Sequence, residues 1–116
     1  MIEFINDPVV LVKDDNTFVL VEDFIVKCYD ETLIIPQGFV TDFASVPRIP
    51  VVFTLFAGRA KKSAILHDYL YEQRLFDRKT CDDLFLCAME AEKLARWIRN
   101  SMYVGVRLGG ASRYEN

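Results

Sequence analysis

His67 is the only histidine in this chain of 116 residues, and an aspartate, Asp68, follows it directly. A second acidic pair, Asp82-Asp83, lies further along the chain. Histidine is the side chain whose unperturbed pKa lies closest to neutrality, so it can accept a proton or bind a metal near pH 7. These residue types, in this order, predict a general base or a metal ligand centred on His67.

Two helices would have to position these groups. On a helix, His67 and Tyr71 are neighbours one turn apart, whereas Asp68 points about 100° away from His67. A second, antiparallel helix could bring Asp82 or Asp83 towards the first. Either carboxylate, bonded to one ring nitrogen, would set the tautomer and leave the other nitrogen to take a proton from water, while Asp68 could hold a hard cation. The alternative is a buried histidine that is hydrogen-bonded for structural reasons alone.

The segment Thr80-Cys81-Asp82-Asp83 also has a purely structural interpretation. Thr80 is a good N-cap residue, and Asp83 at the third helical position resembles a capping box. Asp82 would complement the positive end of the helix dipole. We therefore expect a helix that begins after Thr80, with Asp83 structural and the role of Asp82 open.

The loop before the helices carries further polar side chains. Val46 precedes a proline, which disfavours helix, and Asp42 and Ser45 could meet His67 and Asp68 where this loop joins the first helix. The first interpretation is a turn in which Asp42 and Ser45 bond nearby backbone amides. The second is a metal site made by His67, Asp68 and Asp42, suited to zinc, manganese or iron. The third is a Ser45-His67-Asp42 relay for acyl transfer.

Near the end of the chain, glycines at 105, 109 and 110 bracket Arg107, which suggests a close backbone approach. We expect the Arg107 guanidinium to reach back to a carboxylate, with Asp42 or Asp68 as the natural partner. Arg107 and Tyr71 are also the candidate residues for contacting a bound cofactor.

The pattern of apolar residues predicts an α+β fold. Short β-branched and aromatic runs between turn residues indicate an antiparallel β-meander over residues 9–40, which ends near a Pro-x-Gly turn at 36–38. From about residue 60 the period becomes helical, and Leu84, Ala88, Ala91, Ala95, Ile98 and Met102 would share one face. We expect a single domain, 1–116, with residues 1–48 mainly strands and 60–105 mainly two or three helices packed on the sheet.

Composition narrows the class of protein. Hydrophobic residues make up 52%, which supplies one core, and the net charge of −3 disfavours a nucleic-acid binder. Three cysteines without C-x-x-C spacing predict neither disulfides nor a cysteine-rich zinc site. The acidic N-terminus and the absence of a run near 18 apolar residues predict no signal peptide and no membrane span.

Two surfaces could meet a membrane or a partner. The apolar run at 49–57 is either core or a lipid-facing patch. Lys93, Arg96 and Arg99 form a basic stripe that either is a solvated helix face or touches an anionic bilayer.

His67-Asp68-x-x-Tyr71 followed by Asp82-x-x-Phe85 resembles the core of the phospholipase A₂ superfamily. The resemblance implies that His67 activates water, Asp82 orients His67 and Asp68 ligates calcium. The sequence departs from that pattern in a short His67-to-Asp82 separation, in the absence of the disulfides of secreted members, and in the absence of a glycine-rich calcium loop before the helix.

A longer resemblance covers nearly the whole chain. Gly38-Phe39-Val40-Thr41-Asp42-Phe43-Ala44-Ser45-Val46-Pro47-Arg48, the segment 64–71, Asp82-x-x-Phe85 with Ala88-Met89, and the segment 103–110 follow in order. This order is similar to a small uncharacterised domain family of tailed bacteriophages and prophages. It implies a phage origin and no settled activity.

Two functions from different classes remain open. One is a small hydrolase of ester or related carbonyl-derived bonds, with His67, Asp82 and Ser45 catalytic and a divalent metal, calcium or zinc, on Asp68, Asp42 and His67. The other is a non-catalytic virion, assembly or host-interaction protein whose polar cluster is structural. Expected partners are other phage proteins or a membrane surface, not nucleic acid, and the expected location is the bacterial host cytoplasm, with incorporation into a virion as a further option.

Overall fold

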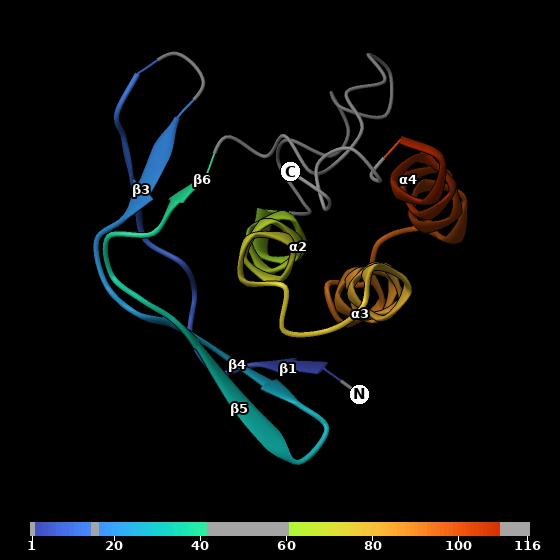
Figure 1. Ribbon diagram of the computed structural model, residues 1–116, viewed down its shortest axis with the longest axis horizontal. Coiled ribbons are helices and arrows are strands. Elements are labelled where there is room, and N and C mark those ends of the chain that lie inside the picture. The colour runs from blue at the N-terminus through green and yellow to red at the C-terminus, as the bar shows by residue number, and fades with distance from the viewer. Residues whose placement is uncertain (1, 15–16, 42–60, 110–116) are drawn as a thin grey trace. The chain divides into compact units, whose positions relative to one another are not determined.

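The N-terminal unit, Met1–Asp42, contains short strands over its described residues (Figure 1). A computed structural model describes residues 2–14, 17–41 and 61–109 of the chain. One sheet has the order β1-β4-β5, formed by β1 (Ile2–Phe4), β4 (Phe24–Cys28) and β5 (Glu31–Ile35). The other has the order β2-β3-β6, formed by β2 (Val10–Val12), β3 (Phe18–Leu20) and β6 (Val40–Thr41).

All pairings of these strands are antiparallel, as the sequence predicts. Chain neighbours form the β2-β3 and β4-β5 hairpins, but β1 pairs with β4 and β6 with β3, so the strands divide between two sheets. Along β4, the buried side chains Phe24, Val26 and Cys28 alternate with more exposed ones. This period of two residues places one face of the central strand in the core.

Local chemistry sets the turn that leads to β6. Phe39 donates its N–H to the carbonyl of Pro36 at 3.0 Å, and Gly38 between them has a φ of +92°. A type II turn requires such a positive φ at its third residue, which glycine adopts without strain. The Pro-x-Gly turn expected from the sequence is therefore present.

The second unit, Phe43–Asn116, is helical over its described residues: α2 (Lys61–Gln73), α3 (Arg78–Ala91) and α4 (Arg96–Gly109). Figure 1 shows these three helices close to end on. Helix α3 packs against both α2 and α4. Their shared apolar core consists of Ala64, Phe85, Met89, Leu94, Ile98, Met102 and Val106.

The α+β class and the order of strands before helices agree with the sequence prediction. The single domain and the packing of the helices on the sheet stay predictions. None of the helices in the described ranges is long and apolar enough to cross a membrane. Cys28 and Cys81 are buried and Cys87 is half-buried, and none of the three is in a disulfide.

The helical pattern that we expected to continue from Leu84 to Met102 is interrupted. Helix α3 ends at Ala91, and Lys93 adopts a left-handed φ of +61°. The N–H of Lys93 bonds Glu90 O, and the N–H of Leu94 bonds Met89 O. This is a Schellman motif, with a lysine where glycine is usual. The period of apolar residues in the sequence did not reveal the break, because core residues lie on both sides of it, Met89 before and Leu94 after.

The predicted cap of α3 is wrong by one turn. Asp77 is the N-cap residue, and its side chain accepts from the Thr80 backbone N–H at 3.2 Å. Thr80 is already the third helical residue, and Asp83 bonds Lys79 and Tyr103 instead of closing a capping box. Aspartate and threonine are both favoured N-cap residues, and the helix begins at the earlier one, Asp77.

Candidate functional site

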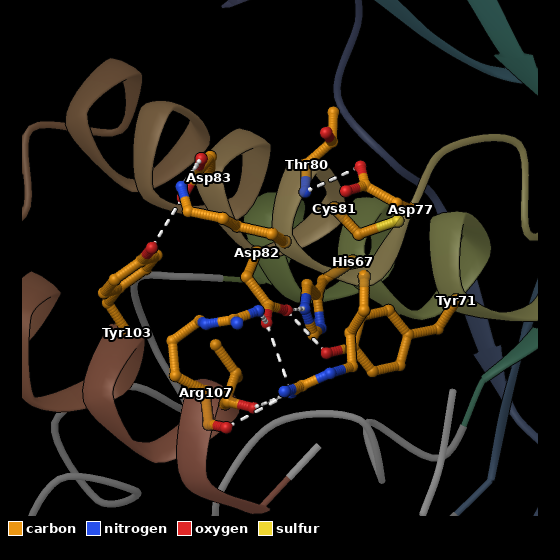
Figure 2. Close-up of polar contacts among 12 residues, drawn as sticks. His67, Tyr71, Asp77, Thr80, Cys81, Asp82, Asp83, Tyr103 and Arg107 are labelled. Atoms are coloured by element: carbon orange, nitrogen blue, oxygen red, sulfur yellow. Dashed lines mark hydrogen bonds and ion pairs between the residues drawn. The ribbon is translucent and has the colours of Figure 1, made fainter. Parts of the chain in front are cut away.

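A buried carboxylate, Asp82 on α3, gathers side chains from all three helices (Figure 2). His67 and Tyr71 come from α2, Arg78 from α3 itself and Arg107 from α4. We call these five residues the Asp82 cluster. The two α2 members lie one turn apart, and Arg78 lies one turn before Asp82, so helical geometry presents each pair on one side of its helix.

Each oxygen of Asp82 has its own donors. His67 Nε2 lies 2.7 Å and the Tyr71 hydroxyl 2.5 Å from Oδ1. Arg107 Nη1 donates to Oδ2 at 2.8 Å, and Arg78 Nη1 lies 3.6 Å from the same oxygen. Arg78 also donates to the carbonyls of Val106 and Arg107, both at 3.2 Å.

Burial and hydrogen bonding shift the pKa of Asp82 in opposite directions. Burial raises its pKa, but the hydrogen bonds from His67, Tyr71 and Arg107 outweigh that effect and hold the pKa below its ordinary value. Asp82 is therefore an anion, and an ionised carboxylate only accepts hydrogen bonds. His67 Nε2 consequently carries the proton in this contact, which sets the tautomer of a neutral ring.

Tyr71 acts as a donor in the cluster at all ordinary pH. Burial, and then the bond to Asp82, raise the pKa of its hydroxyl well above its usual value. The imidazole of His67 lies between two aromatic rings, with ring centroids 4.2 Å from Tyr71 and 4.6 Å from Phe85. The side chains of His67 and Asp82 are both 0% exposed, whereas Arg78 and Arg107 are 23% and 30% exposed.

The structure brings together four of the residues singled out from the sequence: His67, Tyr71, Asp82 and Arg107. Asp68 is buried on α2 and has partners of its own. Asp42 and Ser45 lie outside the described residues, and so do the apolar run at 49–57 and most of the segment 38–48 on which the phage resemblance partly depends.

One predicted contact is corrected. We expected Arg107 to reach Asp42 or Asp68, and it bonds Asp82 instead. Asp82 is 25 residues away from Arg107, and only the packing of α4 on α3 decides which carboxylate the guanidinium meets. Asp82 also does not compensate the helix dipole as the structural interpretation had it, because α3 begins at Arg78 and its first turn contains no acidic residue.

Sequence reasoning missed Arg78. Its spacing of four residues from Asp82 was an available signal, since such pairs face each other on a helix. It also missed the contact between Glu92, the C-cap of α3, and Ser63 in the first turn of α2, where Glu92 Oε2 accepts from the Ser63 backbone N–H at 3.1 Å and from Ser63 Oγ. No pattern among neighbouring residues of the sequence indicates this pair, because Ser63 and Glu92 are 29 residues apart.

A metal site is not formed by the described part of the chain. Among residues 2–14, 17–41 and 61–109, no group of three or more His, Cys, Asp or Glu side chains is arranged to hold an ion. The predicted set includes Asp42, which lies outside those ranges, so that set stays a prediction.

The fold and the cluster together define an α+β protein in which α2, α3 and α4, the helices of the described residues, meet on one buried carboxylate. Residues 18–106 match the sequence family described as "Protein of unknown function (DUF1353)", so the chain belongs to that family. The matched region runs from β3 to the last turn of α4 and contains the Asp82 cluster except Arg107, which is the next residue after its end. Comparison with curated proteins and with solved structures gave no match.

Proposed function

We propose that this chain is a non-catalytic phage or prophage protein, a virion component or an assembly or host-interaction factor, in which the Asp82 cluster locks the helical unit. The phage origin is supported by the ordered motifs that resemble the tailed-phage domain family. Membership in a family of unknown function over most of the chain agrees with the resemblance to an uncharacterised domain family.

The observation that carries the structural role is the enclosure of the imidazole. A general base has to come within hydrogen-bond reach of the water or substrate proton that it removes. The side chain of His67 is 0% exposed, and the rings of Tyr71 and Phe85 pack against it. Its contact with Asp82 joins α2 to α3 in the interior of the unit, as a structural lock requires.

The cluster also specifies how the helices are arranged. A buried anion is costly unless hydrogen bonds and counter-charges satisfy it. Sliding α2 or α4 by one turn along α3 would remove His67 and Tyr71, or Arg107, from Asp82 and leave the charge uncompensated. Only the observed arrangement of the three helices therefore satisfies the carboxylate. Apolar contacts alone would distinguish less sharply between this arrangement and one shifted by a turn.

The test compares two adjacent aspartates. Asp82→Asn should lower the free energy of unfolding by about 3 kcal/mol, because it removes the anion from a buried, paired site. Asp83→Asn is the matched control: Asp83 also bonds a tyrosine and a cation, Tyr103 and Lys79, but is half-exposed. Urea denaturation followed by circular dichroism measures both. Equal, small losses in the two variants would rule out the lock.

A small hydrolase is the second candidate, favoured by a specific geometry. Asp82 contacts His67 Nε2 at 2.7 Å, the orientation that the phospholipase A₂ resemblance implies for a base and its partner carboxylate. Tyr71 on the same carboxylate oxygen would further hold Asp82 in place. In this mechanism the other ring nitrogen, Nδ1, would remove a proton from water that attacks an ester carbonyl.

His67→Ala separates the two candidates. If the cluster is structural, the variant loses several kcal/mol of stability and the wild-type chain releases no p-nitrophenol from p-nitrophenyl esters and no fatty acid from phospholipid vesicles with calcium. If the cluster is catalytic, the wild-type chain turns over one of these esters, and His67→Ala abolishes turnover while its unfolding midpoint stays near that of the wild type.

A further inference from the structure

Two arginines meet at one oxygen of Asp82 and use only part of their hydrogen-bonding capacity there. Arg107 Nη1 lies 2.8 Å and Arg78 Nη1 lies 3.6 Å from Oδ2. The same nitrogen of Arg78 donates to two carbonyls in the last turn of α4. The Arg78 guanidinium also interacts with the Tyr71 hydroxyl. Each guanidinium has five N–H donors, so these contacts leave donors on both arginines unused.

The unused donors face solvent. The side chains of Arg78 and Arg107 are both partly exposed, whereas that of Asp82 is fully enclosed. Among residues 2–14, 17–41 and 61–109, the only buried side-chain nitrogen or oxygen without a hydrogen-bond partner is Arg99 Nε. An unused nitrogen of Arg78 or Arg107 is therefore not buried, and a ligand from solution can reach it.

The two guanidinium groups carry more positive charge than the buried carboxylate neutralises. Asp82 supplies one negative charge, and each arginine carries a permanent positive charge. The neighbouring Lys79 and Asp83 pair with each other at 2.8 Å and neutralise one another. One positive charge therefore remains in excess, shared between two cations that contact the same oxygen. Like charges this close repel each other, and an anion bridging both would relieve the repulsion.

The chemistry of the two side chains selects the kind of anion. A guanidinium group binds phosphate or carboxylate through two parallel N–H···O bonds, which a simple ion such as chloride does not accept. A tetrahedral phosphate presents oxygens in several directions, so one phosphate can contact two guanidinium groups at once. A planar carboxylate has only two oxygens, which one guanidinium group already occupies. Two adjacent arginines with unused donors therefore favour phosphate.

We propose that Arg78 and Arg107 form a surface site for a phosphate group, either free or in a phosphomonoester. Asp82 holds the two guanidinium groups together through their Nη1 atoms (Figure 2), and their solvent-exposed donors bind the phosphate oxygens. Phosphate binding goes beyond the structural role of the cluster, because the lock depends on the contacts of Nη1 whereas the ligand uses the remaining donors. The site exists whether or not the cluster is catalytic.

Nitrogen-15 NMR of the arginine side chains in the full chain tests the site. Inorganic phosphate is added near neutral pH, with sodium chloride keeping the ionic strength constant so that screening does not change. The Nε–Hε signals of Arg78 and Arg107 should shift and saturate together, with one dissociation constant. The signal of Arg96, an exposed arginine at the start of α4, should shift little and without saturation.

Arginine-to-lysine variants separate the site from the lock. Arg78→Lys and Arg107→Lys each keep a cation beside Asp82 but lose the planar donor fork. Each should raise the dissociation constant for phosphate about tenfold, measured on the signal of the remaining arginine. Arg96→Lys makes the same replacement outside the site and should bind phosphate like the wild type. The titration of the wild-type chain decides the question if either variant fails to fold.

Three outcomes would overturn the proposal. The first is a response of Arg78 and Arg107 to phosphate that is no larger than that of Arg96. The second is equal weakening of phosphate binding by all three lysine variants. The third is binding of sodium acetate as tight as that of phosphate, which would assign the site to carboxylates. The stability of Asp82→Asn tests the lock and changes none of these readouts, so the two proposals can fail separately.

Discussion

Two α2 side chains share one oxygen of Asp82, and the hydroxyl of Tyr71 is the simpler of the two to remove. Tyr71→Phe keeps the ring against His67 and deletes only the donor to Oδ1. Because the acceptor is charged and buried, the loss should be about 1.5–3 kcal/mol of unfolding free energy.

Tyr103→Phe provides the control for that experiment. Its hydroxyl donates to Asp83 at 2.6 Å, a bond of similar length at a half-exposed carboxylate where water can replace the donor. Thermal unfolding of the two variants should show a clear decrease for Tyr71→Phe and little change for Tyr103→Phe. Equal decreases would mean that burial around Asp82 does not strengthen its hydrogen bonds.

Cys81 lies next to Asp82, and we expect its thiol to react slowly with alkylating reagents. Burial, together with the neighbouring charges of Asp82 and Asp77, raises the pKa of its thiol to about 12. The thiolate is the reactive form, so iodoacetamide should label Cys81 in the native chain much more slowly than in urea at the same pH. Peptide mass spectrometry should find Cys87, which is half-buried, labelled first. Rapid native labelling of Cys81 would show that this part of α3 opens readily.

At the scale of elements, the ends of the helices are secured by other helices. Glu92 at the end of α3 accepts from the Ser63 N–H in the first turn of α2, and Arg78 at the start of α3 donates to the carbonyls of Val106 and Arg107 in the last turn of α4. These are the positions where a helix lacks its own hydrogen-bond partners. Helix α3 therefore supplies a cap to each of its neighbours.

The end of α3 makes an element-scale prediction possible. Lys93 has a φ of +61°, a conformation that costs a residue with a Cβ about 1–2 kcal/mol. Lys93→Gly removes that cost and loses part of the gain to the greater entropy of the unfolded chain, so the net should be a stabilisation of about 0.5–1 kcal/mol. Urea denaturation measures it. Glu90→Gly, at an exposed position inside α3, should destabilise by about 1 kcal/mol. A destabilised Lys93→Gly would contradict the assigned cap.

At the scale of the whole molecule, Asp82 and Glu92 should make the stability depend on pH in opposite senses, because their pKa values are shifted in opposite directions. The pKa of Asp82 is lowered, so its contribution is present above the ordinary value of 3.8 and is lost as the pH falls through the folded-state pKa. Burial raises the pKa of Glu92, and the bonds from Ser63 only partly oppose this. The contribution of Glu92 is therefore present below 4.5 and is lost as the pH rises through its folded-state pKa.

Variants isolate each acid. Between pH 7 and about pH 3, Asp82→Asn should lose less stability than the wild type, because the group that titrates is gone. Glu92→Gln should lose less than the wild type as the pH rises from about 4 to 7. Urea midpoints across this range give both differences. Parallel curves for the wild type and either variant would show that the acid concerned has the same pKa folded and unfolded.

The sequence by itself determined the strands before the helices, the antiparallel pairing, the Pro36-x-Gly38 turn and the one-turn relation of His67 to Tyr71. Each of these follows from neighbours within a few residues, where side-chain period and turn chemistry act directly. The hypothesis that Asp82 meets His67 also belongs here, since two helices joined by a short turn lie antiparallel.

Only the tertiary structure decided that Arg107 meets Asp82, that Glu92 caps α2, and that the imidazole of His67 is enclosed. The partners of Arg107 and Glu92 are 25 and 29 residues away. Such pairs depend on how α4 and α2 pack on α3, which no local pattern encodes. The sequence pointed to the lone histidine, but in the folded chain the side chains converge on the buried Asp82. A charge removed from water is costly unless hydrogen-bond donors and counter-charges satisfy it.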